Sequence, residues 1–313
     1  MIFKVGSRKS KLALVQTQIV INSLKRINND EFITVPVTTK GDRDMLPLFS
    51  LDSKGIFERE VDTAVVNGEV DFAIHSLKDI PSDLHEELVI ASIPKRAEPN
   101  DVLISKDKKC LSKLPKGAIV GTSSLRRAVQ INRKNPYLKV NPIRGNVETR
   151  VGKIGKVCDA IVLAAAGIIR LKMNTLITER FDLLDFVPAP GQGAIAVVCR
   201  RDNPKLIKLL QSIEDTVSRN SIDAERALIQ HIESGCRFPI GAIATYDSKL
   251  HKLVLHASVF SADGKKNIRV SKSAPVSNSF DLGERVAKVL IEKGVSNLAD
   301  GWRQAIQDWN TRS

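Results

Sequence analysis

The chain has 313 residues, of which 42% are hydrophobic and 27% are charged, and its formal net charge is +13. This composition is typical of a soluble globular protein, and the length predicts about two domains, with room for a small third. No apolar run approaches the roughly 20 residues that a membrane span needs, and the N-terminus has no apolar core followed by a cleavage site. We therefore expect neither a membrane partner nor a signal peptide.

In the first half of the chain, short apolar strands alternate with helices. This alternation implies α/β structure with a largely parallel sheet and crossover helices. A segment around Pro99, residues 95–105, is typical of a hinge between domains. The expected strands are 2–7, 32–39 and 70–76, and the expected helices are 11–27 and 57–68.

A second alternating unit follows the hinge, and a small α+β region ends the chain. Residues 188–202 combine a Pro/Gly turn with a strand, which we interpret as the chain crossing back to the first unit. In the last hundred residues a hairpin is expected around ADGKK (262–266). The other expected elements are strands at 118–124, 138–145 and 159–167 and helices at 124–135, 220–234 and through 282–290.

The segment GTSSLRR (121–127) has the pattern of an anion site. A strand ends, hydroxyl residues form a turn, and a helix begins with free N–H groups that favour an anion. Arg126 and Arg127 lie in the first helical turn, where the helix dipole disfavours cations, so a bound anion would offset the repulsion. The alternative is simple capping by Ser123 or Ser124 with two solvated arginines.

Two further segments, GSRKS (6–10) and RGNVETR (144–150), have the same character. Ligands of α/β sheets bind at the carboxyl ends of the strands, so three such segments indicate one shared site. Arginine in turns suits bidentate capture of carboxylates or phosphates. A basic surface that aids solubility is the competing interpretation of the charge. Nucleic-acid binding is disfavoured by the aromatic content of 4% and by the lack of a basic tail.

Two other segments carry reactive side chains. DFAIHSLKDIP (71–81) places His75, Lys78 and Asp79 at a strand end, where an ionised Asp79 could stabilise a positive charge or move a proton. A surface ion pair beside a half-buried histidine would give the same pattern. Cys236 follows a helix-ending glycine, and Arg237 would favour its thiolate, although an inert thiol is the ordinary alternative.

The cysteines predict the compartment and exclude some sites. Cys110, Cys158, Cys199 and Cys236 are scattered without a CxxC pair. This spacing argues against a structural zinc site and against a disulfide framework, and it predicts a reducing, cytoplasmic location. We expect no metal.

Taken together, these segments resemble the hydroxymethylbilane synthase (porphobilinogen deaminase) family. The resemblance implies two α/β domains like those of type II periplasmic binding proteins, plus a small C-terminal α+β domain. It places them at 1–97 plus 194–214, with a mobile loop at about 42–60, then at 98–193 and at 215–313. The matching segments are GSRKSKLALVQ (6–16), KGIFERE (54–60), DFAIHSLKDIP, VGTSSLRR, IRGNVETR, AAAGIIRL (164–171), PAPGQGA (188–194) and ESGCRFPIGA (233–242).

The family likeness also implies the activity. It is a transferase that polymerises four porphobilinogen units, with loss of ammonia, on a dipyrromethane cofactor held by a thioether to Cys236. Hydrolysis then releases hydroxymethylbilane for haem or sirohaem biosynthesis, and we expect a monomer. Asp79 is implied as the catalytic carboxylate. The implied residues for carboxylates of cofactor and substrate are Arg8, Ser10, Gln16, Lys54, His75, Lys78, Thr122, Ser123, Ser124, Arg126, Arg127, Arg144, Gly145, Arg150, Arg170 and Gln192.

Three other functions fit parts of the pattern. A solute-binding protein shares the two-lobed fold, but the missing signal peptide and the third domain argue against it. A LysR-type effector domain would be preceded by a helix-turn-helix segment, and none is evident. A cysteine hydrolase would need a histidine partner for Cys236. The chain departs from the family pattern at Lys11 and Arg59, which affects the expected loop and not the reaction class.

Overall fold

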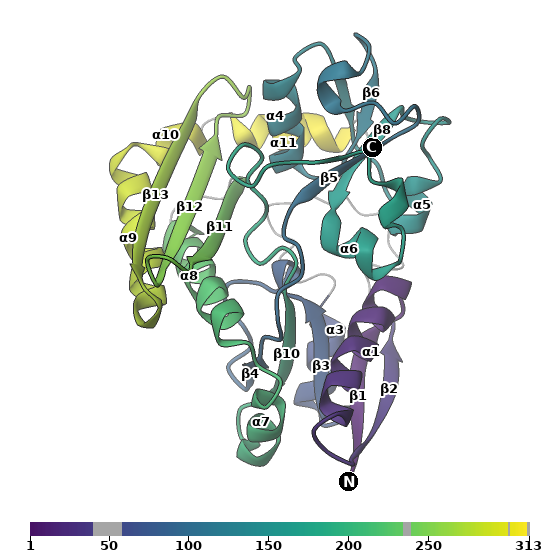
Figure 1. The fold of residues 1–313 in the computed structure, drawn as a ribbon, viewed down its shortest axis with the longest axis vertical. Coiled ribbons are helices and arrows are strands. Elements are labelled where there is room, and N and C mark those ends of the chain that lie inside the picture. Colours follow the sequence, from purple (N-terminus) through teal and green to yellow (C-terminus); the bar gives the residue numbers. More distant parts are fainter. Residues whose placement is uncertain (40–57, 234–238, 300, 312–313) are drawn as a thin grey trace.

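The computed structural model describes residues 1–39, 58–233, 239–299 and 301–311, which form three sheets with their helices (Figure 1). In this view the first sheet lies below, the second at the upper right and the third at the left. The predicted fold class is confirmed, with two five-stranded α/β sheets followed by an α+β region. None of the described helices is long and apolar enough to cross a bilayer.

The first sheet has the strand order β2-β1-β3-β10-β4, and β1, β2 and β3 run parallel. Helices α1 (Lys11–Lys25) and α7 (Pro204–Gln211) pack on one face, and α3 (Arg59–Val66) packs on the other. The Ser10 side chain caps α1 by accepting from the backbone N–H of Ala13. The strands are β1 (Ile2–Arg8), β2 (Glu31–Val37), β3 (Phe72–Ser76), β4 (Leu88–Ser92) and β10 (Ile195–Arg200).

The second sheet repeats this layout with the order β7-β6-β8-β5-β9. Helix α4 (Leu125–Lys134) covers one face, and α5 (Val147–Val151) and α6 (Ala165–Arg170) lie at the other. The strands are β5 (Asp101–Ser105), β6 (Ile119–Gly121), β7 (Lys139–Asn141), β8 (Ala160–Ala164) and β9 (Glu179–Arg180).

Over the residues that the structure describes, each sheet is largely parallel, as expected, with one antiparallel strand among its five, β10 in the first sheet and β5 in the second. The chain passes from the first sheet to the second through residues 93–100 and returns through 181–194. It enters each sheet from the side where the parallel strands end, so β5 and β10 must run antiparallel to β8 and β3. The predicted crossing back is confirmed, but the end of the expected hinge, 101–105, is strand β5.

The third region consists of α8 (Thr216–Glu233), a three-stranded antiparallel sheet and α9 (Ser279–Glu292). The predicted hairpin is confirmed, and Gly264 in its turn has a φ of 72°. Two short helices that we did not predict, α10 (Val295–Ala299) and α11 (Trp302–Thr311), follow α9. Trp302 and Trp309 of α11 are buried in the core around α4. The strands are β11 (Ile240–Asp247), β12 (Lys252–Phe260) and β13 (Asn267–Pro275).

Candidate active site

A recess of about 110 Å³ collects several predicted site residues from both α/β sheets. Gln16 comes from α1, Lys78 from the turn after β3, and Arg127, Arg150 and Arg170 from three helices of the second sheet. Whole-ligand pockets span about 300–1,000 Å³, so this recess suits one acidic arm of a ligand and not an entire ligand. The other lining residues are Leu12, Ser76, Val147, Leu163, Ala164, Ala166, Gly167, Gly193 and Ala194.

The cations of the recess are electrostatically crowded. Desolvation lowers the pKa of Lys78 to about 8, an effect that Asp79 opposes and Arg127 reinforces. Solvent still reaches the Lys78 side chain, so this desolvation comes from the surrounding walls of the recess. Desolvation also lowers the pKa values of Arg150 and Arg170 to about 10, and Arg127 adds to the effect at Arg150. A bound carboxylate would relieve this crowding.

Asp79 ends a short 3-10 turn, Leu77–Asp79, directly after β3. The N–H of Leu77 donates to the Ala194 carbonyl at 3.1 Å, which joins the turn to the start of β10. Buried Glu58, at the start of α3, lies within electrostatic reach of Asp79. Desolvation, then the Asp79 carboxylate, raise the pKa of Glu58 to about 9, and Arg8 opposes them. Arg8, Glu58 and Asp79 therefore belong to one cluster.

Arg126 and Arg127 lie in the first turn of α4, and both are buried against Asp101. Asp101 Oδ2 is 2.8 Å from Nη2 of Arg126, and Asp101 Oδ1 is 2.8 Å from Nη2 of Arg127. Gln192 Nε2 also donates to Asp101, at 2.9 Å. Burial disfavours a charge at Asp101, but the two arginines outweigh it and hold the pKa of that carboxyl below its usual value. Of these residues only Arg127 also lines the recess.

The hydroxyl residues before α4 are occupied within their own loop. Ser124 caps the helix by accepting from the N–H of Arg127, and Thr122 accepts from the N–H of Ser124. Ser123 donates to the Ile143 carbonyl. These contacts are the local capping that the sequence offered as the alternative to ligand binding.

The turn before α5 brings Arg144, Gly145 and Arg150 together. Gly145 has a φ of 110°, and a Cβ there would lie 2.6 Å from a Thr149 methyl, so a side chain would be strained. The Gly145 carbonyl accepts from Nε of Arg150 at 2.7 Å, which directs this guanidinium toward the recess. Arg150 lies on α5 and Arg170 on α6, whereas we expected both in turns.

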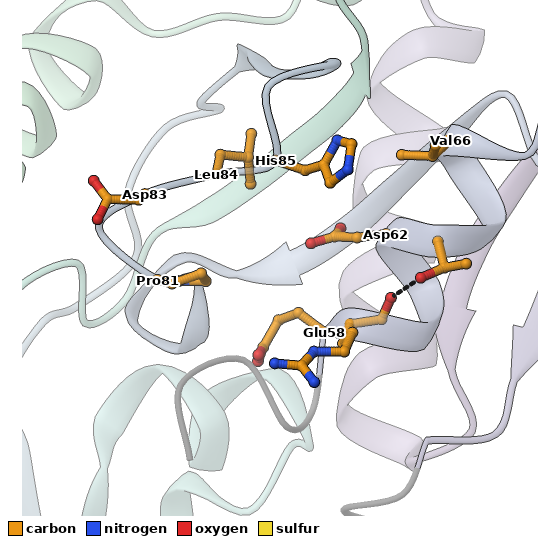
Figure 2. A pocket seen from close by; sticks show the side chains of 9 residues that line it. Glu58, Asp62, Val66, Pro81, Asp83, Leu84 and His85 are labelled. Atoms are coloured by element: carbon orange, nitrogen blue, oxygen red, sulfur yellow. Dashed lines mark hydrogen bonds between the residues drawn. The ribbon is translucent and has the colours of Figure 1, made fainter. Parts of the chain in front are cut away.

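His75 lies away from the recess and pairs with α3. Its Nε2 is 3.0 Å from Oδ1 of Asp62. A larger pocket of about 450 Å³ opens between α3 and the loop 81–85, where Glu58, Asp62 and Asp83 contribute carboxylates (Figure 2). Its carboxylates would repel an acidic ligand, so we place the candidate site at the cationic recess instead.

Two predicted residues, Lys54 and Cys236, lie outside the described part of the chain. Cys158 and Cys199 are buried, and desolvation raises both thiol pKa values, that of Cys199 to about 11. Cys110 is half-buried. In the described ranges, no group of three or more Asp, Glu, His or Cys side chains could hold a metal ion.

Sequence reasoning missed Asp101 and Glu58. Asp101 opens an apolar strand directly after Pro99 and Asn100, and a fully buried carboxylate there requires cationic partners. That signal was present in the sequence, but its partners lie 25 and 26 positions away at Arg126 and Arg127. Nothing in the sequence pattern distinguished Glu58 from a solvated helix-start carboxylate.

Known proteins match the chain over most of its length. The family model "Porphobilinogen deaminase, dipyromethane cofactor binding domain" matches residues 3–208, and "Porphobilinogen deaminase, C-terminal domain" matches 220–292. A probable porphobilinogen deaminase of Nitrosopumilus maritimus is 51% identical, over 98% of both chains. The porphobilinogen deaminase of Geobacillus sp. is 44% identical, over 95% of this chain and 96% of that one.

Among solved structures, immunogenic lipoprotein A from Vibrio vulnificus is 11% identical with a TM-score of 0.45. The matched region covers 67% of this chain and 93% of the lipoprotein chain. This likeness is too distant to add to the topology described above. The two family models together match most of the chain, in the order that the sequence segments predict. The chain belongs to the porphobilinogen deaminase family.

Proposed function

We propose that the recess binds one acidic arm of the pyrrole chain beside Asp79, and that four porphobilinogen units are joined there to give hydroxymethylbilane. The chain is a porphobilinogen deaminase. The observation that carries this proposal is the meeting of Gln16, Lys78, Arg127, Arg150 and Arg170 around one recess. Porphobilinogen carries two carboxylates, so a growing chain accumulates negative charge that must be paired when it leaves water. Charge-assisted hydrogen bonds contribute roughly 1.5–3 kcal/mol each.

Most of the predicted carboxylate-binding residues fall into two groups. Gln16, Lys78, Arg127, Arg150 and Arg170 line the recess and would contact the ligand. Arg8 and Arg144 belong to neither group, and Lys54 lies outside the described residues. The second group does not line the recess, and its members make polar contacts within the protein. That group is Ser10, His75, Thr122, Ser123, Ser124, Arg126, Gly145 and Gln192.

The residues present fit a dipyrromethane group, because the crowded cations of the recess need anionic partners. We propose its attachment to Cys236, since burial disfavours the thiolates of Cys158 and Cys199. When bound, the cofactor supplies the pyrrole carbon to which substrate is joined. The chain's own contribution is to orient the acidic arms and to hold the Asp79 carboxylate where positive charge develops as ammonia leaves. Asp79 is also suited to take up the proton that the coupled ring loses.

The domain boundaries 1–97 plus 194–214, 98–193 and 215–313 remain a proposal. The membership of the three sheets supports them, since β10 and α7 join the first sheet and α8 begins the third region. Of the expected mobile loop 42–60, only 58–60 are described, and Arg59 and Glu60 belong to α3. We further propose a cytoplasmic monomer, which size-exclusion chromatography with light scattering would test.

One measurement tests the proposed function directly. Intact protein should exceed its sequence mass by two porphobilinogen units minus two ammonia, and it should convert porphobilinogen with release of ammonia. A protein of unmodified mass that still turns over porphobilinogen would contradict the covalent cofactor. A protein that does not turn it over would contradict the function itself.

A further inference from the structure

Two side chains of α8, in the third region, bind the backbone just after Asp79. Arg226 Nη2 donates to the carbonyls of Pro81, at 3.1 Å, and Ser82, at 2.9 Å. Gln230 Nε2 donates to the same Ser82 carbonyl, at 3.1 Å. Arg226 and Gln230 are four residues apart, so they lie on one face of the helix. These bonds connect the third region to a turn of the first sheet.

The other side of the Asp79 turn is also connected to α8. Gly191, with a φ of 74°, lies against this turn, and a Cβ there would be 2.4 Å from a Leu77 methyl and 3.1 Å from the Lys78 nitrogen. The N–H of Gly191 donates to Glu225 Oε2 at 2.6 Å. Glu225 is fully buried and directly precedes Arg226 in the helix. Consecutive residues of α8 therefore hold segments on both sides of the turn.

We propose that Arg226 and Gln230 are positioning residues, which set the place of the Asp79 carboxylate relative to α8. The inference rests on the proposed function, because it matters only if Asp79 acts on material attached at Cys236. Leu77 and Ile80 anchor the start and the end of the turn in the core, but Pro81 after it has no N–H with which to hold the following backbone. The donors from α8 supply that anchorage.

Arg226→Met and Gln230→Met test the proposal, because methionine keeps the stem of each side chain and removes its donors. Positioning errors of about 1 Å can reduce rates about 100-fold. We expect kcat to fall roughly 10- to 100-fold in Arg226→Met and less in Gln230→Met, with KM within about threefold and the cofactor mass intact. Arg226→Lys should recover part of kcat, since an ammonium can donate to one carbonyl.

Arg201→Met is the matched control. Arg201 donates to the carbonyls of Glu86 and Leu88, at 3.2 and 3.0 Å, but it joins segments of the first sheet only. Arg201→Met should lower the melting temperature about as much as Arg226→Met does, but it should leave kcat near the wild-type value. Equal kcat losses in Arg201→Met and Arg226→Met would overturn the positioning role, as would wild-type kcat in Arg226→Met.

If Arg226→Met does not fold, the comparison of Gln230→Met with Arg201→Met decides in the same way. Wild-type protein that lacks the added mass and turnover would instead refute the proposed function. Failure of the proposed function would be seen in the wild-type protein, whereas failure of the positioning role would be seen only in the variants. The two outcomes can therefore be distinguished.

Discussion

Arg127 and Asp101 form a buried pair whose guanidinium and carboxylate atoms approach to 2.8 Å, one on α4 and the other at the start of β5. Arg127 also donates to the Val162 carbonyl and to Gln192 Oε1, so β8 and the return segment of the chain meet at the same point. Arg127, which lines the recess, is thus held in place by a network of hydrogen bonds centred on Asp101. Arg127 therefore serves both the packing of the second sheet and the proposed ligand contact.

Asp101→Asn should destabilise the protein by about 3–5 kcal/mol, because it leaves two buried guanidinium groups without their carboxylate. The folded-state pKa of Asp101 is depressed, so its stabilising contribution is present above the unfolded pKa of about 3.9 and is lost as pH falls below it. The gap between wild type and variant in urea unfolding should accordingly be large at pH 7 and shrink in acid. Asp202→Asn, which breaks an exposed pair with Arg200, should cost about 0–1 kcal/mol. Similar losses in both variants would contradict the role of the network.

The pH dependence of turnover should show the loss of the positive charge on Lys78. Its pKa is lowered to about 8, so its ammonium, and its attraction for a carboxylate, are lost as pH rises through that value. The fall in kcat/KM reports Lys78 before substrate binds, whereas a bound substrate carboxylate would raise the pKa in the complex and move the fall in kcat upward in pH. Lys78→Arg keeps the charge throughout and should abolish the fall, whereas Lys139→Arg, at an exposed lysine on β7, should leave it. A wild-type profile of kcat/KM that stays flat to pH 10 would exclude Lys78 from the site.

Arg150→Leu removes a cation that lines the recess. The loss of one charge-assisted bond, roughly 1.5–3 kcal/mol, should raise KM for porphobilinogen roughly 10- to 150-fold. Raising the salt concentration should weaken turnover of the wild type, because screening reduces long-range attraction, and should affect the variant less. Arg180→Leu, which breaks a half-exposed pair with Glu98 outside the recess, is the control. An unchanged KM in Arg150→Leu would remove Arg150 from the proposed ligand contacts.

Asp79→Asn keeps the size and much of the hydrogen bonding of the side chain but removes its charge. We expect kcat to fall by at least about 100-fold, as for the loss of a positioned acid–base or electrostatic group, while the cofactor mass remains. Asp83 is exposed on the loop after Asp79, so Asp83→Asn should leave kcat nearly unchanged. Near-normal kcat in Asp79→Asn would refute its catalytic assignment.

The sequence predicted most of the fold because its strands and helices have clear periodicity and end at glycines such as Gly68 and Gly294. It did not predict α11, whose Trp302 and Trp309 are buried in a core with α4 and with Phe260 of β12, contacts that are distant in sequence. The strand expected at 138–145 is short because Pro142 and Gly145 interrupt it, leaving Lys139–Asn141.

The sequence predicted which residue types gather at the candidate site. It did not predict which of them line the recess and which make contacts only within the protein. Motifs put Arg126 and Arg127 side by side, yet only Arg127 lines the recess, while Arg126 donates to the Val187 carbonyl. His75 was grouped with Lys78 and Asp79 because they are close in the sequence. A strand alternates its faces, and His75 points toward Asp62 on α3 instead.

The four cysteines give the sharpest test of the covalent cofactor. A thioether is a carbon–sulfur bond, so denaturation and thiol reductants should not remove the added mass, unlike a disulfide. Peptide mapping should find that mass on the fragment that contains Cys236. Cys236→Ser should lack it and be inactive, because a hydroxyl is a much poorer nucleophile than a thiolate at neutral pH.

Serine at the other three positions supplies matched controls and should leave the added mass in place. At Cys158 and Cys199, burial raises the thiol pKa, so neither offers a thiolate at neutral pH. A buried hydroxyl without a partner at position 199 should lower stability by about 1–3 kcal/mol in urea unfolding, and the loss at position 158 should be smaller because the Cys158 thiol already donates to the Lys153 carbonyl. Cys110→Ser, at a half-buried turn, should cost less. Active enzyme with an unmodified Cys236, or with its added mass on any of these three cysteines, would overturn the assignment.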